Sequence, residues 1–179
     1  CSSDLALVPA TRENLFGWLT HLYPIWAQLD EEASYLSAWV GFAELALGGC
    51  TTTMDHLYVH PRGGGDLITA EITAATELGM RFHATRGSMS RSKKDGGLPP
   101  NEVVQDQDEI LAESERLVAQ HHQRDPHAMV QVALAPCSPF SVTPELMTDP
   151  RFREAAPDCF AIPGSEKSVY VLKDECLAE

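Results

Sequence analysis

Side chains suited to holding a small polar ring follow three short runs of apolar or β-branched residues. Asp55 and His56 end the first run, Arg86 follows the second, and Cys137 follows the third. A carboxylate beside an imidazole can orient one tautomer or a bound molecule, although Asp55 could equally cap the turn that follows. The planar guanidinium of Arg86 can pair with a carbonyl and a ring nitrogen of a heterocycle. The pattern predicts a binding site for a flat, hydrogen-bonding ring.

Ser88 is a further side chain that could line the same site, together with Cys137. Ser88 adds a hydroxyl two residues after Arg86. Cys137 lies between Pro136 and Pro139, which restrict the backbone around it. Because no base near Cys137 in the sequence would lower the pKa of its thiol, we expect a pocket wall and not a nucleophile.

The histidines do not have the spacing of a metal site. His56 and His60 are four residues apart, but the strand pattern before them and Pro61 after them argue against a shared helical face. The pair at 121–122 ends a predicted helix, where a cation suits the dipole. We therefore expect these residues to be structural.

Strands and helices are expected to alternate along the chain. Strands are predicted at 50–55, 80–85 and 129–135, with a long polar loop at 86–104, and helices at 13–29 (kinked or split at Pro24), 30–47, 66–78, 105–122 and from Thr143 onward. Prolines should prevent a helix beyond Asp149, and 168–172 could form one more strand. This alternation is typical of a parallel α/β fold, whose sites lie at the carboxyl ends of the strands.

Composition excludes several classes of protein. Thirteen Lys and Arg against 26 Asp and Glu give the 179 residues a formal net charge of −13, which argues against a nucleic-acid partner. No apolar run is long enough to span a membrane, and no secretory signal is visible. Five cysteines without a C-x-x-C pair suggest the reducing cytoplasm. A nucleotide-binding α/β domain is disfavoured because phosphate-loop glycines are absent.

Four stretches together resemble a known family. They are 48–56 (GGCTTTMDH), 79–90 (GMRFHATRGSMS), 96–118 and 132–143 (VALAPCSPFSVT). The chain is similar over about residues 15–147 to the nucleobase and triazine aminohydrolases of the amidohydrolase superfamily. The resemblance implies a (β/α)8 TIM-type barrel, a divalent zinc or iron ion, and hydrolytic loss of ammonia from a small heterocyclic base. A purine-like substrate such as 8-oxoguanine, converted to urate, is the expectation, with Arg86, Ser88, His56 and Cys137 binding it.

The sequence also departs from that family. The His-x-His metal ligands are absent, and the family's His-Leu-Ala-Glu motif has only a counterpart at 176–179 (CLAE). The resemblance would give Cys176 the place of a metal ligand and Glu179 the catalytic proton transfer. Because a whole barrel needs about 250 residues, we expect a partial barrel at 1–149 with a divergent tail at 150–179. Such a segment needs a second copy of itself or the missing half of the barrel, and should be inactive alone. The alternative is a catalytically inactive remnant or an interaction module.

Overall fold

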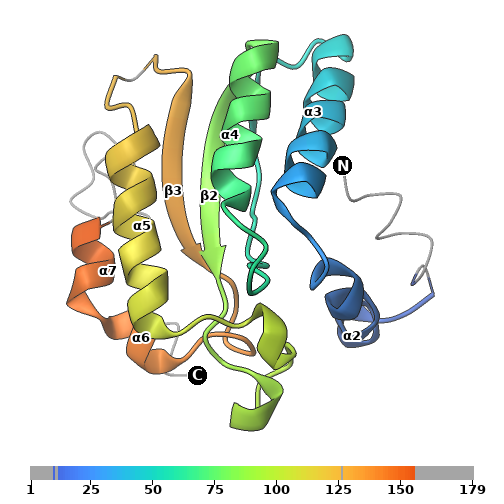
Figure 1. Ribbon diagram of the computed structural model, residues 1–179, viewed down its shortest axis with the longest axis vertical. Helices are drawn as coiled ribbons and strands as arrows, with labels where there is room; N and C mark the ends of the chain where they lie inside the picture. The colour runs from blue at the N-terminus through green and yellow to red at the C-terminus, as the bar shows by residue number, and fades with distance from the viewer. Residues whose placement is uncertain (1–9, 11, 126, 156–179) are drawn as a thin grey trace.

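A computed structural model describes residue 10 and the ranges 12–125 and 127–155 (Figure 1). Helices and strands alternate from β1 onward, as the sequence predicts. The elements are α2 (Leu15–Trp26), α3 (Glu31–Leu47), β1 (Thr52–Met54), α4 (Leu67–Leu78), β2 (Arg81–Ser88), α5 (Gln107–His121), β3 (Val130–Pro136), α6 (Pro144–Thr148) and α7 (Pro150–Ala155). Two short 3-10 turns, Lys93–Asp95 and Asn101–Val103, lie between β2 and α5.

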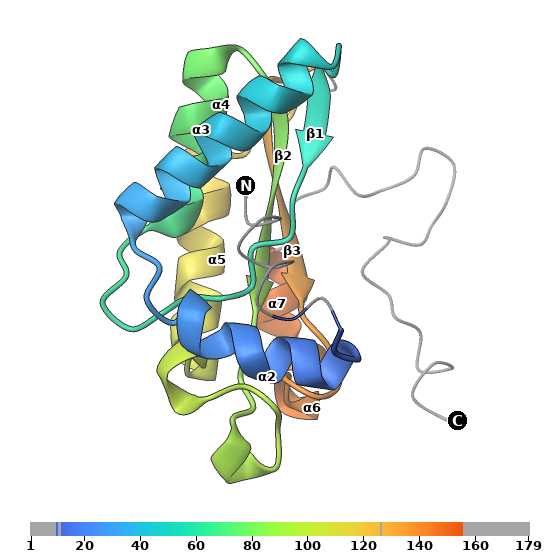
Figure 2. The ribbon, with the colours of Figure 1, turned by 90° about the vertical axis from the view of Figure 1, so that its right-hand side faces the viewer.

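The three strands form one parallel sheet in the order β1-β2-β3. Helices α3, α4 and α5 lie along one face of this sheet, and α2 crosses near the carboxyl ends of the strands (Figure 2). We call the covered side the helix face and the other side the open face. Within the described residues, no helix runs along the open face (Figure 2). The parallel α/β fold predicted from the sequence is confirmed.

Local sequence signals explain where the helices begin. Asp30, Asp66 and Thr143 each precede a helix, and each side chain accepts a hydrogen bond from the backbone N–H three residues later, at 2.8, 3.1 and 3.4 Å. These bonds satisfy donors that the first helical turn leaves without partners. Gly79 ends α4 with a φ of 68°, a conformation that favours glycine. These boundaries agree with the sequence analysis.

The main core lies between the sheet and the helix face. Phe82 of β2 packs against Phe42 of α3 with ring centroids 4.9 Å apart, and both rings are buried. Ala84 and Val132, from neighbouring strands, are fully buried in the same cluster. A second cluster joins α5, β3, α6 and α7 around Leu134. Alternate side chains of β2 and β3 therefore point to the helix face.

Three local predictions were wrong. Strand β2 continues to Ser88, so Arg86 is a strand residue paired with Leu134 and not part of a loop. Helix α2 is not split at Pro24, although the missing N–H of this residue removes one backbone hydrogen bond from the last turn. Pro150 begins α7, because proline is tolerated in a first helical turn. The expected strand at 168–172 lies outside the described residues. None of the described helices could cross a membrane.

Candidate functional site

Adjacent residues of β2 point to opposite faces of the sheet. Arg86 shares the parity of the buried Phe82 and Ala84, and its guanidinium reaches side chains before and within α5 on the helix face. Gly87 has the opposite parity. A Cβ atom built on Gly87 would lie 2.5 Å from Tyr58 Cβ and 2.9 Å from His56 Nε2. His56 and Tyr58 therefore cover β2 from the open face, at a position with room only for glycine.

Arg86 is the largest fully buried side chain in the described structure. One terminal nitrogen donates to the Gly87 carbonyl at 2.7 Å, and the other donates to Gln105 Oε1 at 2.6 Å and to Glu113 Oε2 at 2.7 Å. Gln105 Nε2 also donates to Glu113 Oε2 at 3.0 Å. Burial acts to raise the pKa of Glu113, but the bond from Gln105 and the charge of Arg86 outweigh burial and lower it. Both terminal nitrogens of Arg86 are thus occupied in joining β2 to α5.

His60 belongs to the same buried group. Its Nε2 lies 3.1 Å from the carbonyl oxygen of Gly87, which also accepts from Arg86. Burial and the nearby Arg86 charge lower the pKa of His60 from 6.5 to about 4. The imidazole is therefore neutral at neutral pH, and its N–H donates to the Gly87 carbonyl.

This neutral histidine should make stability depend on pH. Between about pH 4 and 6.5 the unfolded chain binds a proton on His60 that the folded chain does not, so the free energy of unfolding should fall as pH falls through that window. His60→Gln keeps a hydrogen-bond donor but does not titrate. It should reduce the slope of the free energy of unfolding against pH by the equivalent of up to one bound proton. Urea unfolding at a series of pH values measures it. Replacing the exposed His21 by glutamine is the control, and an equal change in both variants would contradict the assignment.

His56 is held on the open face by a neighbouring strand. Its Nε2 lies 3.0 Å from the carbonyl oxygen of Ala135 in β3, and its ring centroid is 5.1 Å from that of Tyr58. The His56 side chain remains exposed. An exposed imidazole with one nitrogen engaged can offer its other nitrogen to a bound molecule.

Cys137 and Tyr58 complete this group. Both side chains pack against the same buried cluster, and burial, with a smaller contribution from Cys137, raises the pKa of the Tyr58 phenol to about 12. Burial also raises the pKa of Cys137, despite bonds to Ser141 and Ser138 that lower it. At neutral pH the phenol is a hydrogen-bond donor and the thiol is uncharged. The interpretation of Cys137 as a wall residue and not a nucleophile fits this environment.

The structure thus divides the four predicted substrate-binding residues. His56 lies against Tyr58, and Cys137 packs against the same buried cluster as Tyr58, whereas Arg86 faces the other side of the sheet. Ser88 is buried, and its hydroxyl has no hydrogen-bond partner among the described residues. The assignment of these residues to substrate stays a prediction. Cys176 and Glu179, the predicted metal ligand and catalytic acid, lie outside the described residues.

The described residues do not by themselves fit a divalent metal. No group of three or more His, Cys, Asp or Glu side chains comes together in the part of the chain that the structure describes. His56 and His60 contact different backbone carbonyls, those of Ala135 and Gly87. We therefore assign no chemical step of a metal to these residues.

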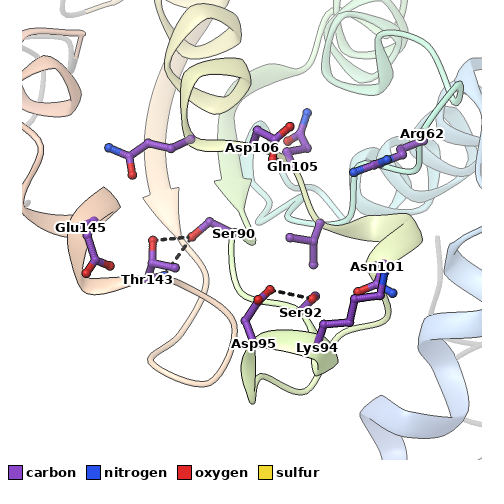
Figure 3. Close-up of a pocket in the computed structure, with 12 residues that line it drawn as sticks. Arg62, Ser90, Ser92, Lys94, Asp95, Asn101, Gln105, Asp106, Thr143 and Glu145 are labelled. Atoms are coloured by element: carbon purple, nitrogen blue, oxygen red, sulfur yellow. Dashed lines mark hydrogen bonds between the residues drawn. The ribbon is translucent and has the colours of Figure 1, made fainter.

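A polar pocket of about 390 Å³ lies beyond the ends of β2 and β3 (Figure 3). Its lining residues come from the loop after β1, the β2–α5 connection, the start of α5 and the segment around α6: Arg62, Ser90, Ser92, Lys94, Asp95, Asn101, Val104, Gln105, Asp106, Gln107, Thr143 and Glu145. Ser90 and Thr143 join its two sides, since Thr143 N donates to Ser90 Oγ at 2.9 Å. None of the four predicted substrate-binding residues lines it, but Gln105 connects it to Arg86.

Sequence reasoning missed Tyr58, Gly87, Gln105 and Glu113. A strand reading extended past Asp55 would have placed Tyr58 on the same face as His56, because side chains alternate along a strand. No local signal marks Gln105 or Glu113, which meet Arg86 only through the packing of α5 on β3.

Comparison with known proteins identifies the family of the chain. The family model described as the amidohydrolase family matches residues 10–155. The chain is 54% identical over 142 residues to an 8-oxoguanine deaminase from Pseudomonas aeruginosa, covering 79% of this chain and 32% of that protein. It is 39% identical over 147 residues to a hydroxydechloroatrazine ethylaminohydrolase from Pseudomonas sp. strain ADP, covering 82% of this chain and 31% of the relative. The chain belongs to the amidohydrolase family, and it spans about a third of the length of these curated relatives.

The chain is also similar to solved structures. The zinc complex of atrazine chlorohydrolase from Arthrobacter aurescens TC1 superposes with a TM-score of 0.70 at 32% identity, over 76% of this chain and 32% of that one. A guanine deaminase from C. acetobutylicum with bound guanine has a TM-score of 0.63 at 17% identity, over 76% of this chain and 30% of that one, and supports the fold alone. A divalent metal is thus present in a solved member of the family.

Proposed function

We propose that this chain carries the substrate side of a hydrolytic deaminase of purine-like bases, with 8-oxoguanine as the first candidate substrate. The observation that carries the proposal is the packing of His56 and Tyr58 over Gly87, toward the carboxyl ends of the strands, with Cys137 packed against the same buried cluster as Tyr58. Ligands of parallel α/β proteins bind at this end of the sheet. The 54% identity to an 8-oxoguanine deaminase supports the choice of substrate.

The three residues supply the contacts that a hydroxylated purine needs. The nitrogen of His56 that does not face Ala135 can accept from or donate to a ring nitrogen. The phenol of Tyr58, with its pKa raised to about 12, offers a proton to a carbonyl oxygen. The uncharged Cys137 thiol provides an apolar wall for the flat ring.

The rest of the site would come from a complete barrel. We propose that β1–β3 are consecutive strands of a (β/α)8 barrel whose further strands pair with the edges of β1 and β3. Those strands would belong to the missing barrel half or to a second copy of this chain. A zinc or iron requirement is proposed for the complete protein, supported by the zinc complex of a solved relative.

A segment exchange tests this function. Residues 10–155 replace the matching segment of the Pseudomonas 8-oxoguanine deaminase, and ammonia release is measured with 8-oxoguanine, guanine and a hydroxylated triazine. The chimaera should release ammonia, and His56→Ala within it should lower kcat/KM at least about tenfold, equivalent to about 1.4 kcal/mol of transition-state stabilisation. The separate 179-residue chain should show no turnover with added zinc or iron.

The control and the contradicting outcomes are distinct. His21→Ala, at an exposed position of α2, should leave kcat/KM of the chimaera unchanged. A folded, metal-loaded chimaera that releases no ammonia from any of the three compounds would contradict the proposal. It would favour the alternative of an inactive remnant or interaction module.

A further inference from the structure

Two acidic side chains meet just beyond the carboxyl end of β1. Asp55 directly follows the strand, and its carboxyl group forms a side-chain hydrogen bond with Glu71 of α4. Asp55 Oδ1 also accepts the backbone N–H of Thr85 in β2 at 2.9 Å. Glu71 Oε2 is buried, and no donor among the described residues reaches it. Two ionised carboxylates can only accept hydrogen bonds, so this contact requires an acid proton on one of them.

The surroundings of the pair favour retention of that proton. Burial raises the pKa of Glu71, and the nearby Asp55 raises it further. Burial also raises the pKa of Asp55, although bonds from Glu71 and Thr85 and the proximity of His56 act in the opposite direction. Among the described residues, no cation makes an ion pair with either carboxyl group. Two close carboxyl groups in such a site titrate as a unit and hold one proton between them.

Three charged groups on the adjoining elements have hydrogen-bond partners away from the pair. On α4, Glu77 accepts a hydrogen bond from the phenol of Tyr35 in α3. Glu31 of α3 accepts the backbone N–H of Asp66 before α4 begins. Arg81, at the start of β2, donates to the carbonyl of Ala128. His56 is the remaining titratable neighbour that acts on the pair.

We propose that Asp55 and Glu71 share a single proton, and that this proton-linked pair is a positioning device for His56. The pair ties Asp55 to α4 on the helix face, and the Thr85 bond ties it to β2. Because side chains alternate along an extended segment, the next residue, His56, is directed to the open face above Gly87. The inference rests on the proposed function only where it gives His56 a role in base binding.

Infrared difference spectroscopy of the 179-residue chain tests the shared proton without substrate or metal. The wild-type chain at neutral pH should show the C=O band of a protonated carboxylic acid, and Glu71→Gln should lack it. Glu77→Gln, the same change at an exposed position of α4, is the matched control and should keep the band. A band that is absent from the wild type, or that persists in Glu71→Gln, would overturn the shared proton.

Histidine NMR tests the positioning. The His56 ring resonance, assigned with His56→Gln, should stay at its wild-type position in Glu71→Gln, whose amide can still donate to Asp55, and should shift in Glu71→Met. A folded Glu71→Met chain with an unshifted His56 resonance would overturn the positioning role. If Glu71→Met does not fold, a pH titration of the wild-type chain provides the test. The His56 resonance should move at the pH where the infrared band disappears. A His56 resonance that stays unchanged at that pH would overturn the positioning role. Neither readout depends on deaminase activity, so failure of the proposed function is recognised separately.

Discussion

Arg86→Met is expected to lower the free energy of unfolding by about 3 kcal/mol, because it leaves the Glu113 carboxylate without its cation and removes one of the two donors to the Gly87 carbonyl. The Arg86 side chain is 1% exposed, whereas that of Glu113 is 36% exposed, so water can partly solvate the unpaired Glu113. We therefore expect a loss at the low end of what removal of one partner of a buried ion pair costs. Urea unfolding of the two chains at neutral pH measures the difference.

Two further variants make this result specific. Arg86→Met combined with Glu113→Met should be more stable than the single variant, because the uncompensated carboxylate is removed with its partner. Arg151→Met, which removes a half-exposed arginine from its pairs with Asp108 and Asp149, should change stability less. A stable Arg86→Met chain whose chimaera loses base binding would instead support the sequence prediction that Arg86 contacts the substrate.

Arg86 and His56 illustrate which features of the structure could be predicted from the sequence. Parallel strands and helical caps follow from local patterns, because alternation and capping residues act within a few positions. The face on which Arg86 lies depends on where β2 ends, and Gly87-Ser88 looks like the start of a loop. The strand continues because β3 and Leu57 supply pairing partners distant in sequence. A difference of a few residues in the strand boundary thus decides whether Arg86 is placed in a loop or on the helix face of β2.

The sequence indicates the position of a residue in the sheet best where the signal is local. Asp55 and His56 were recognised as a pair, and both lie toward the carboxyl end of the sheet. The partners that hold them, Glu71 on α4 and the Ala135 carbonyl on β3, come from elements 16 and 79 positions away in the sequence, respectively. Such partners become visible only once the helices are packed against the sheet.

The backbone at Gly87 joins the two faces of the site. Its carbonyl accepts from both Arg86 and His60, while its missing side chain leaves room for Tyr58 and His56. A change at this residue therefore acts on the buried cluster and on the open-face group at once. Glycine is required here by close approach, because φ of Gly87 is not positive.

Gly87→Ala is therefore expected to destabilise the chain by about 2 kcal/mol and to displace His56. The added Cβ would lie 2.8 Å from the backbone Cα of Tyr58, so a flexible side chain cannot relieve the clash and the 56–58 segment must move. Urea unfolding gives the energy, and the His56 ring resonance reports the displacement.

Gly48→Ala is the matched control for this substitution. Gly48 also has a negative φ, −76°, and an added Cβ would come no closer than 3.3 Å to the carbonyl oxygen of Leu45. Its cost should be much smaller, and the His56 resonance should not shift. If Gly87→Ala matched this control in both measurements, His56 and Tyr58 could not lie across β2 as the structure has them. The three-residue group that carries the proposed function would then lose its geometric basis, whatever the activity of the chimaera.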